Sequence, residues 1–310
     1  FFIRGRSCTG QDLECILIYY MSFNRKTLSI LKIAIVGDCH GLWSEIDNEI
    51  LSLIKPDLVL FVGDISDGNI KIIKKINLLS VPSYVILGNH DRGRDKSGET
   101  LIKQIRLLKE KYCAWDLRIF NNDINILGGR PCSSGGGYYL SKEVLGVYGP
   151  ITEDDSVRKI ISSSVKARKD LPLIIISHTG PSGLGSEPNS ICGKDWKKPS
   201  SDWGDRDLAT AITKIQKERF VDLVIFGHMH NQLNRNLGSR KMFVIDKKGT
   251  SYLNTAIVPR YKTDSKGKKI INFSWVEFNN KKLSFISQRW YSNDGSLYKE
   301  NILYESGNSS

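Results

Sequence analysis

The chain has 310 residues, of which 40% are hydrophobic and 25% are charged, as in ordinary globular proteins rather than disordered or fibrous ones. No apolar run approaches the roughly 18 residues of a membrane-spanning helix, so we expect no membrane partner. The net charge of +12 suits an anionic partner, and solvated lysines on helix faces explain it equally well.

Five short apolar runs, rich in Val, Ile and Leu, predict strands that are buried on both faces. They lie in residues 32–38, 57–64, 83–91, 171–178 and 221–230. Helical patterns lie in residues 43–55, 69–79, 98–112, 152–169 and 205–220. The fourth of these helices opens on Thr152 with an acidic residue three positions later, close to a capping box. This alternation predicts α/β units around a largely parallel sheet.

Two further segments predict antiparallel hairpins, one over 117–129 and one over 271–291. Because no repeat or Pro/Gly linker divides the body, we expect one domain over residues 32–291. Residues 1–31 are expected to be an N-terminal extension outside the fold, with Met21 close to a natural start. Residues 292–310 are expected to form a loose polar C-terminal tail.

Six cysteines are scattered along the chain without a C-x-x-C pair. This spacing argues against a disulfide framework or a zinc ribbon. It favours a reducing intracellular compartment, which we take to be the cytoplasm, with an organellar stroma as the alternative.

Each of the five apolar runs ends in residue types that bind metals. These residues are Asp38 and His40, Asp64, Asn89 and His90, His178, and His228 and His230. Ligands of open α/β sheets bind beyond the carboxyl ends of the strands, so we expect these side chains to converge. A single histidine in such a place is better explained by packing or exposure. All five histidines of the chain belong to this set, which favours a metal site.

These motifs, in this order, resemble those of the calcineurin-like metallophosphoesterase superfamily. They are D-x-H at 38–40, G-D at 63–64, G-N-H-D at 88–91, the lone His178 and G-H-x-H at 227–230. Loop sequences such as "HGLW" and "CGKDW" further resemble a subfamily of cyanobacteria and plastids. The resemblance implies an α/β fold, a four-layer αββα sandwich of two mixed sheets flanked by helices, with the metal site at the strand C-terminal ends.

The resemblance also implies two divalent metal ions, with manganese favoured over iron or zinc. One ion would be held by Asp38, His40, Asp64 and His230. The other would be held by Asp64, Asn89, His178 and His228, so that Asp64 bridges both. A metal-bridging hydroxide would then attack the phosphorus of a phosphate ester.

His90 is the non-ligand histidine of the family, placed to protonate the leaving oxygen, with Asp91 orienting it. Asn89, His90 and Arg130 are the candidate substrate contacts, and Arg92 and Arg94 are alternatives to Arg130. Asp67 is expected to support the metal ligands. Gly68 follows it where protein phosphatases carry an arginine, which puts protein phosphatase activity in doubt.

We therefore expect a phosphomonoesterase that acts on a small phosphorylated substrate. A phosphodiesterase for a nucleotide-like compound is the alternative within the enzyme class, and a non-catalytic binding scaffold is the alternative outside it. A nucleic-acid substrate lacks support in the sequence. The loop 181–205 either caps the pocket or packs Trp196 and Trp203 within itself, and Cys39 is expected to be a spacer that faces the core.

Overall fold

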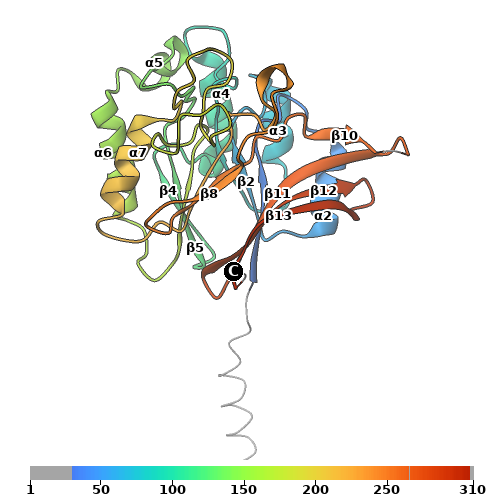
Figure 1. The fold of residues 1–310 in the computed structure, drawn as a ribbon. Coiled ribbons are helices and arrows are strands. Elements are labelled where there is room, and N and C mark those ends of the chain that lie inside the picture. The colour runs from blue at the N-terminus through green and yellow to red at the C-terminus, as the bar shows by residue number, and fades with distance from the viewer. Residues whose placement is uncertain (1–29, 265, 308–310) are drawn as a thin grey trace, which may run out of the picture.

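The computed structural model describes residues 30–307 except residue 265, and its first sheet has seven strands within these residues (Figure 1). Six follow the order β13-β12-β11-β1-β2-β3, and β10 pairs with β11. Their bounds are β1 Ile30–Val36, β2 Leu58–Val62, β3 Ser83–Ile86, β10 Tyr261–Thr263, β11 Lys269–Asn279, β12 Lys282–Ser292 and β13 Leu297–Glu305. The sheet is mixed, because β1, β2 and β3 are parallel and the other pairings are antiparallel.

The second sheet follows the order β4-β5-β6-β7-β9-β8. Its strands are β4 Leu117–Phe120, β5 Ile124–Gly128, β6 Leu173–Ile176, β7 Leu223–Phe226, β8 Phe243–Ile245 and β9 Ser251–Asn254. The four strands β5, β6, β7 and β9 are parallel, and antiparallel β4 and β8 close the two edges. This sheet is mixed as well.

Helices follow most of the parallel strands. They are α2 Glu45–Ile54, α3 Ile70–Asn77, α4 Glu99–Leu108, α5 Lys142–Tyr148, α6 Glu153–Ser164 and α7 Arg206–Ile215, with 3₁₀ turns at Lys109–Lys111 and Asn234–Asn236. The predicted start of α6 is confirmed, because Asp155 N donates to Thr152 Oγ1 and Thr152 N donates back to Asp155 Oδ2, a capping box. Within the described part of the chain, no helix is long and apolar enough to cross a membrane.

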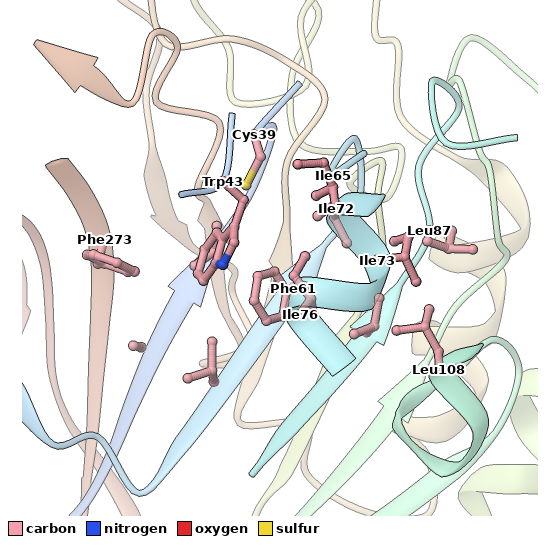
Figure 2. Packing of buried hydrophobic residues seen from close by; sticks show 14 of the residues in the cluster. Cys39, Trp43, Phe61, Ile65, Ile72, Ile73, Ile76, Leu87, Leu108 and Phe273 are labelled. Atoms are coloured by element: carbon pink, nitrogen blue, oxygen red, sulfur yellow. The ribbon is translucent and has the colours of Figure 1, made fainter. Parts of the chain in front are cut away.

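Alternating side chains of the strands divide the core into layers. In β1, Ile33 and Ile35 join a cluster shared by both sheets, whereas Ala34 and Val36 face the helices outside the first sheet. Figure 2 shows this outer cluster, in which Phe61 of β2 packs with the isoleucines of α3. A third cluster joins the outer face of the second sheet to α6 and α7. The predicted four-layer αββα sandwich is therefore confirmed.

The antiparallel hairpins predicted over 117–129 and 271–291 are present as β4–β5 and β11–β12. The expectation of a loose C-terminal tail is wrong for residues 297–305, because they form β13 and pair with β12. Of the expected N-terminal extension, residues 1–29 lie outside the described residues, while Ile30 and Leu31 belong to β1. The boundaries of a 32–291 domain thus extend at both ends in the structure.

Candidate metal centre

The carboxyl ends of five parallel strands, three from one sheet and two from the other, carry the predicted ligands. Backbone bonds join the segments there: Asp38 N donates to Gly63 O at 3.1 Å, and His40 N donates to Asp64 O at 2.8 Å. In the second sheet, Gly227 N donates to His178 O at 2.8 Å, and the His178 side chain connects the two sheets through the bond from its Nδ1 to Val62 O of β2 at 2.9 Å. Loops far apart in sequence are therefore held together by main-chain contacts.

One cluster of ligand atoms consists of Asp38, His40 and His230, whose atoms all lie within 4.8 Å of one another. The Nε2 atoms of the two histidines are 3.4 Å apart, and His230 Nε2 is 3.6 Å from Asp38 Oδ1. Asp38 is almost fully buried and also accepts a bond from His228 N at 3.1 Å. These contacts leave the two imidazoles and one carboxylate oxygen directed at a common point.

A second cluster consists of Asp64, His178 and His228, again with ligand atoms within 4.8 Å. His178 Nε2 lies 3.3 Å from Asp64 Oδ2 and 2.9 Å from Asn89 Oδ1. The other ring nitrogen of His178 is 2.9 Å from the carbonyl oxygen of Val62 and, as Nδ1–H, donates to it. This bond orients the ring and leaves Nε2 as the ligand nitrogen.

The charges in the second cluster depend on one another. Burial favours the neutral form of His178, but the Asp64 carboxylate outweighs this effect and raises the pKa of His178 to about 10. The His178 imidazolium in turn keeps the pKa of Asp64 well below its usual range despite burial. Burial and the neighbouring His178 together lower the pKa of His228 to about 4, so that imidazole is neutral. The neutral His228 can therefore bind a cation directly, whereas His178 must first lose its proton.

Backbone conformation also marks the ligand positions. Asp38, His40, Asp64 and His228 have positive φ angles of 51°, 47°, 48° and 66°, although none is glycine. Such strain gathers at functional sites, where the surrounding structure holds it in place. Four predicted ligands adopt this sparsely populated conformation, which indicates that the fold maintains backbone strain in order to set the direction of these side chains.

The glycines next to the ligands are required by close approach. A Cβ added at Gly63 would overlap the His178 ring, and one added at Gly227 would overlap Asp38 Oδ2.

The donor set of the two clusters combines carboxylate, amide and imidazole groups, which suits a divalent transition metal such as manganese, iron or zinc better than calcium. The residues present therefore fit two divalent ions.

The expected supporting role of Asp67 agrees with its position, because Asp67 Oδ1 lies 3.1 Å from His40 Nδ1. His90 belongs to neither of the two clusters described above, and its ligand atom lies instead within 4.8 Å of those of His40 and Asp67. Its side chain is 55% exposed, and its backbone N–H donates to Asp64 Oδ1 at 2.8 Å. His90 is thus fixed at its main chain and open at its ring, as a group that meets substrate must be.

The expectation that Asp91 orients the His90 ring is wrong. The buried Asp91 carboxylate instead accepts bonds from Ile65 N, Ser66 N and Gly88 N, at 3.0, 2.7 and 2.8 Å. These donors lie in the loops after β2 and β3. Asp91 therefore holds together the two loops that carry Asp64 and Asn89.

The expectation that Arg130 binds substrate is also wrong. Its side chain is 2% exposed and forms ion pairs with Asp205 at 2.7 Å and Asp207 at 3.0 Å. Its Nη1 also donates to Tyr139 O at 2.9 Å, so all three guanidinium nitrogens are held by protein acceptors and none is presented to the candidate site. Arg92 and Arg94 instead line a pocket of about 260 Å³ that also includes Asn89 and His90.

Cys39 faces the core, as predicted, and Figure 2 shows it beside Trp43 in the cluster under the helices. Burial raises the pKa of its thiol to about 12. A thiol with this pKa is almost entirely protonated at neutral pH and is a poor nucleophile or metal ligand. Cys39 is a spacer between two ligands.

The loop 181–205 reaches the metal centre. A pocket of about 550 Å³ is lined by His228 and His230 together with Trp196 and Trp203 of this loop. Asp195 and Arg240 also line it, and the sequence analysis singled out neither. A lone arginine past the last motif carries no local signal, because its partners lie some 50 residues earlier in the chain.

Comparison with known proteins agrees with this geometry. A family model described as "Calcineurin-like phosphoesterase" matches residues 31–232. The protein TT1561 of Thermus thermophilus is 11% identical, with a TM-score of 0.50 over 81% of this chain and 100% of that one. Purple acid phosphatase PPD1 from yellow lupin (Lupinus luteus) is 17% identical, with a TM-score of 0.53 over 89% of this chain and 54% of that one. No curated protein matches the chain. The two structures share the fold.

Proposed function

The chain belongs to the calcineurin-like phosphoesterase family and is a metal-dependent phosphoester hydrolase, and from that premise we propose that it is a dinuclear phosphomonoesterase. The observation that carries the proposal is the presence of two adjacent ligand clusters at the ends of the parallel strands. A small molecule with a terminal phosphate is the proposed substrate.

Asp38, His40 and His230 would hold one ion, and Asn89, His178 and His228 would hold the other. Asp64 would be shared, since its carboxylate lies 3.3 Å from His178 Nε2 and its backbone carbonyl oxygen accepts from His40 N at 2.8 Å, between the two clusters. Two bound ions lower the pKa of water and neutralise charge on the phosphoryl oxygens. We propose manganese as the native metal on the chemistry of this mixed donor set.

His90 is the proposed proton donor to the leaving oxygen. Its exposed ring lies edge-on to His40, with centroids 5.1 Å apart, so it borders the centre without being needed as a ligand. General acids contribute in this way when they lie within hydrogen-bond reach of the departing group. Asn89 would both bind an ion and contact a phosphoryl oxygen.

The pocket that contains His90 supports a monoester. Arg92 and Arg94 line it and bring positive charge to the place where a phosphate must enter. A terminal phosphate carries about two negative charges at neutral pH, and a guanidinium binds such a group through paired hydrogen bonds. A diester carries one negative charge and needs less compensation.

Four cysteines of the described chain are free and buried, namely Cys39, Cys113, Cys132 and Cys192. Free thiols are typical of proteins in reducing compartments, where disulfides do not persist. On this ground we propose that the enzyme works in the cytoplasm.

Metal analysis and a paired substrate assay test the proposal. Purified protein should contain about two divalent ions per chain after reconstitution with Mn²⁺. It should hydrolyse para-nitrophenyl phosphate faster than bis-para-nitrophenyl phosphate at equal metal concentration. Exclusive cleavage of the diester contradicts the monoester assignment, and a protein that binds no metal and cleaves neither compound is a scaffold.

A further inference from the structure

The 550 Å³ pocket beside His228 and His230 has the size of a small-molecule site, and its lining includes aromatic side chains. Two tryptophans of the loop 181–205, Trp196 and Trp203, form part of its wall. Neither belongs to the three hydrophobic clusters that form the core of the described chain. Their presence therefore needs an explanation other than packing of the sheets.

Trp203 is fixed in place by its surroundings. Its ring N–H donates to the carbonyl oxygen of Ser134 at 2.9 Å, and its backbone N–H donates to Cys192 O at 2.9 Å. A Cβ added at Gly136 would come within 2.5 Å of the Trp203 ring, so the glycine loop lies directly on it. Trp203 is therefore a rigid part of the pocket wall.

Trp196 is 44% exposed, although it is a large apolar side chain. Its ring meets the Trp203 ring at a centroid distance of 5.0 Å and an interplanar angle of 82°. Edge-to-face contact with a fixed ring sets the direction of Trp196. An exposed, oriented indole at the wall of a pocket is a surface on which a flat ring can stack.

Arg240 ties this wall to the metal centre. Its Nη1 donates to the carbonyl oxygens of Ser190 at 2.8 Å and Gly193 at 2.6 Å, and its Nε donates to His230 O at 3.0 Å. Its Nη2 is 3.3 Å from Asp195 Oδ1, next to Trp196 in sequence. One buried side chain thus holds the tryptophan loop and a metal-ligating residue together, and the pocket is built before any substrate arrives.

We propose that the substrate carries a flat aromatic group, a nucleobase or an aryl ring, which stacks on Trp196 while its phosphate lies at the metal centre. This inference rests on the proposed function, which supplies the phosphate site next to the pocket. Trp196 is then the residue that selects among phosphoesters with the same reacting group. The positive charge of Lys194, whose Nζ is 5.4 Å from the Trp203 ring centroid, adds attraction for an anionic substrate at the rim.

Two pairs of substrates, in all of which the leaving group is a primary alcohol, test the inference. Adenosine 5′-phosphate is compared with ribose 5-phosphate, and benzyl phosphate with cyclohexylmethyl phosphate, which is puckered. In the manganese-loaded enzyme, kcat/KM for the planar member should be higher by about 5-fold or more, the ratio that base–aromatic stacking supplies. Most of the difference should lie in KM.

Variants assign the preference to the indole. Trp196→Ala should bring the planar-to-nonplanar ratio close to one, and Trp196→Phe should restore part of it. Phe220→Ala removes an exposed aromatic ring that does not line the pocket, and it should leave the ratio unchanged. Adenosine should also quench the tryptophan fluorescence of the wild type and less that of Trp196→Phe, a readout that needs no turnover.

A preference in the adenosine pair alone identifies a nucleobase, and one in the benzyl pair alone identifies an aryl ring. Hydrolysis of all four compounds with equal kcat/KM within each pair overturns the inference but leaves the proposed function standing. Hydrolysis of none of the four, nor of para-nitrophenyl phosphate, under any divalent metal contradicts the proposed function itself.

Discussion

Asp64 and Asp67 lie three residues apart, and both contact a histidine of the metal centre, yet they differ in burial. Asp64 is 2% exposed and contacts His178, whereas the side chain of Asp67 is 43% exposed and contacts His40. A buried carboxylate in the proposed bridging position cannot be replaced by solvent. An exposed carboxylate that orients one ring can be replaced in part by water.

Asp64→Asn and Asp67→Asn therefore form a matched pair. We expect Asp64→Asn to lower kcat by at least about 100-fold, since it removes the charge that both ions share. Asp67→Asn should lower metal affinity or kcat by about 10-fold to 100-fold, the usual effect of a partner that orients a ligand. Steady-state kinetics and metal content by mass spectrometry measure both, and equal losses in the two variants would contradict the bridging role.

At the same scale, sequence reasoning identified the residues that converge but not every partner. The seven proposed ligands were predictable because each follows a strong apolar run, a signal that lies close by in the chain. Arg130 was misjudged because its burial depends on Asp205 and Asp207, which lie far along the chain. Asp91 was misjudged because its partners are backbone N–H groups, which exist at almost every position and leave no mark in sequence.

At the scale of elements, the parallel strands were predictable and the edges were not. β2, with the sequence LVLFV, is buried at all five positions, which gives an unbroken apolar run. β13, with the sequence LYKENILYE, is largely exposed and has no such run. It exists because β12 offers it an unpaired edge, and that is a property of the folded sheet rather than of the segment.

The loop 181–205 is an element without regular structure, so its shape depends on side-chain anchors, of which Arg240 is the most connected. Arg240→Ala removes a buried cation that bonds to three loop carbonyl oxygens and pairs with Asp195. We expect a loss of roughly 3 kcal/mol in the free energy of unfolding, as for other broken buried ion pairs. Hydrogen exchange should become faster in residues 188–201.

The neighbouring Lys241 is exposed and serves as the control. Lys241→Ala should change the free energy of unfolding by less than about 0.5 kcal/mol and leave hydrogen exchange in the loop unaltered. Thermal or urea unfolding with exchange mass spectrometry measures both variants. A loop that exchanges equally slowly in Arg240→Ala would show that the tryptophans, not the arginine, hold it.

At the scale of the whole molecule, the sandwich stacks two sheets (Figure 1). The carboxyl ends of their parallel strands meet at one edge, and this brings together proposed ligands from position 38 to position 230. Each sheet supplies part of the charge: the carboxylates come from the loops after β1 and β2, and His178, His228 and His230 from those after β6 and β7. The protonation state of the candidate metal centre therefore depends on residues of both sheets. Because protons and metal ions compete for the same side chains, metal binding should depend on pH.

His178 shows the sign of that link. Its pKa of about 10 in the presence of Asp64 means that the ring is protonated at neutral pH in the metal-free protein. A histidine must be neutral to bind a metal, so metal binding at pH 7 should release about one proton from this ring. Apparent metal affinity should then rise with pH, by up to about tenfold per unit, and level off as the pH passes through the pKa of His178. The same shift makes the metal-free fold lose the stability of the His178–Asp64 pair between the unfolded pKa near 6.5 and about 10.

Calorimetric titration with Mn²⁺ in buffers of different ionisation enthalpy counts the released protons. His90→Ala, which alters a histidine outside the ligand set, should release the same number as the wild type. His178→Asn has no proton to lose there and should release about one fewer, with a flatter dependence of affinity on pH. If wild type and His178→Asn release equal numbers of protons, the charge that a metal displaces resides elsewhere in the centre, and the pairing of His178 with Asp64 does not govern metal entry.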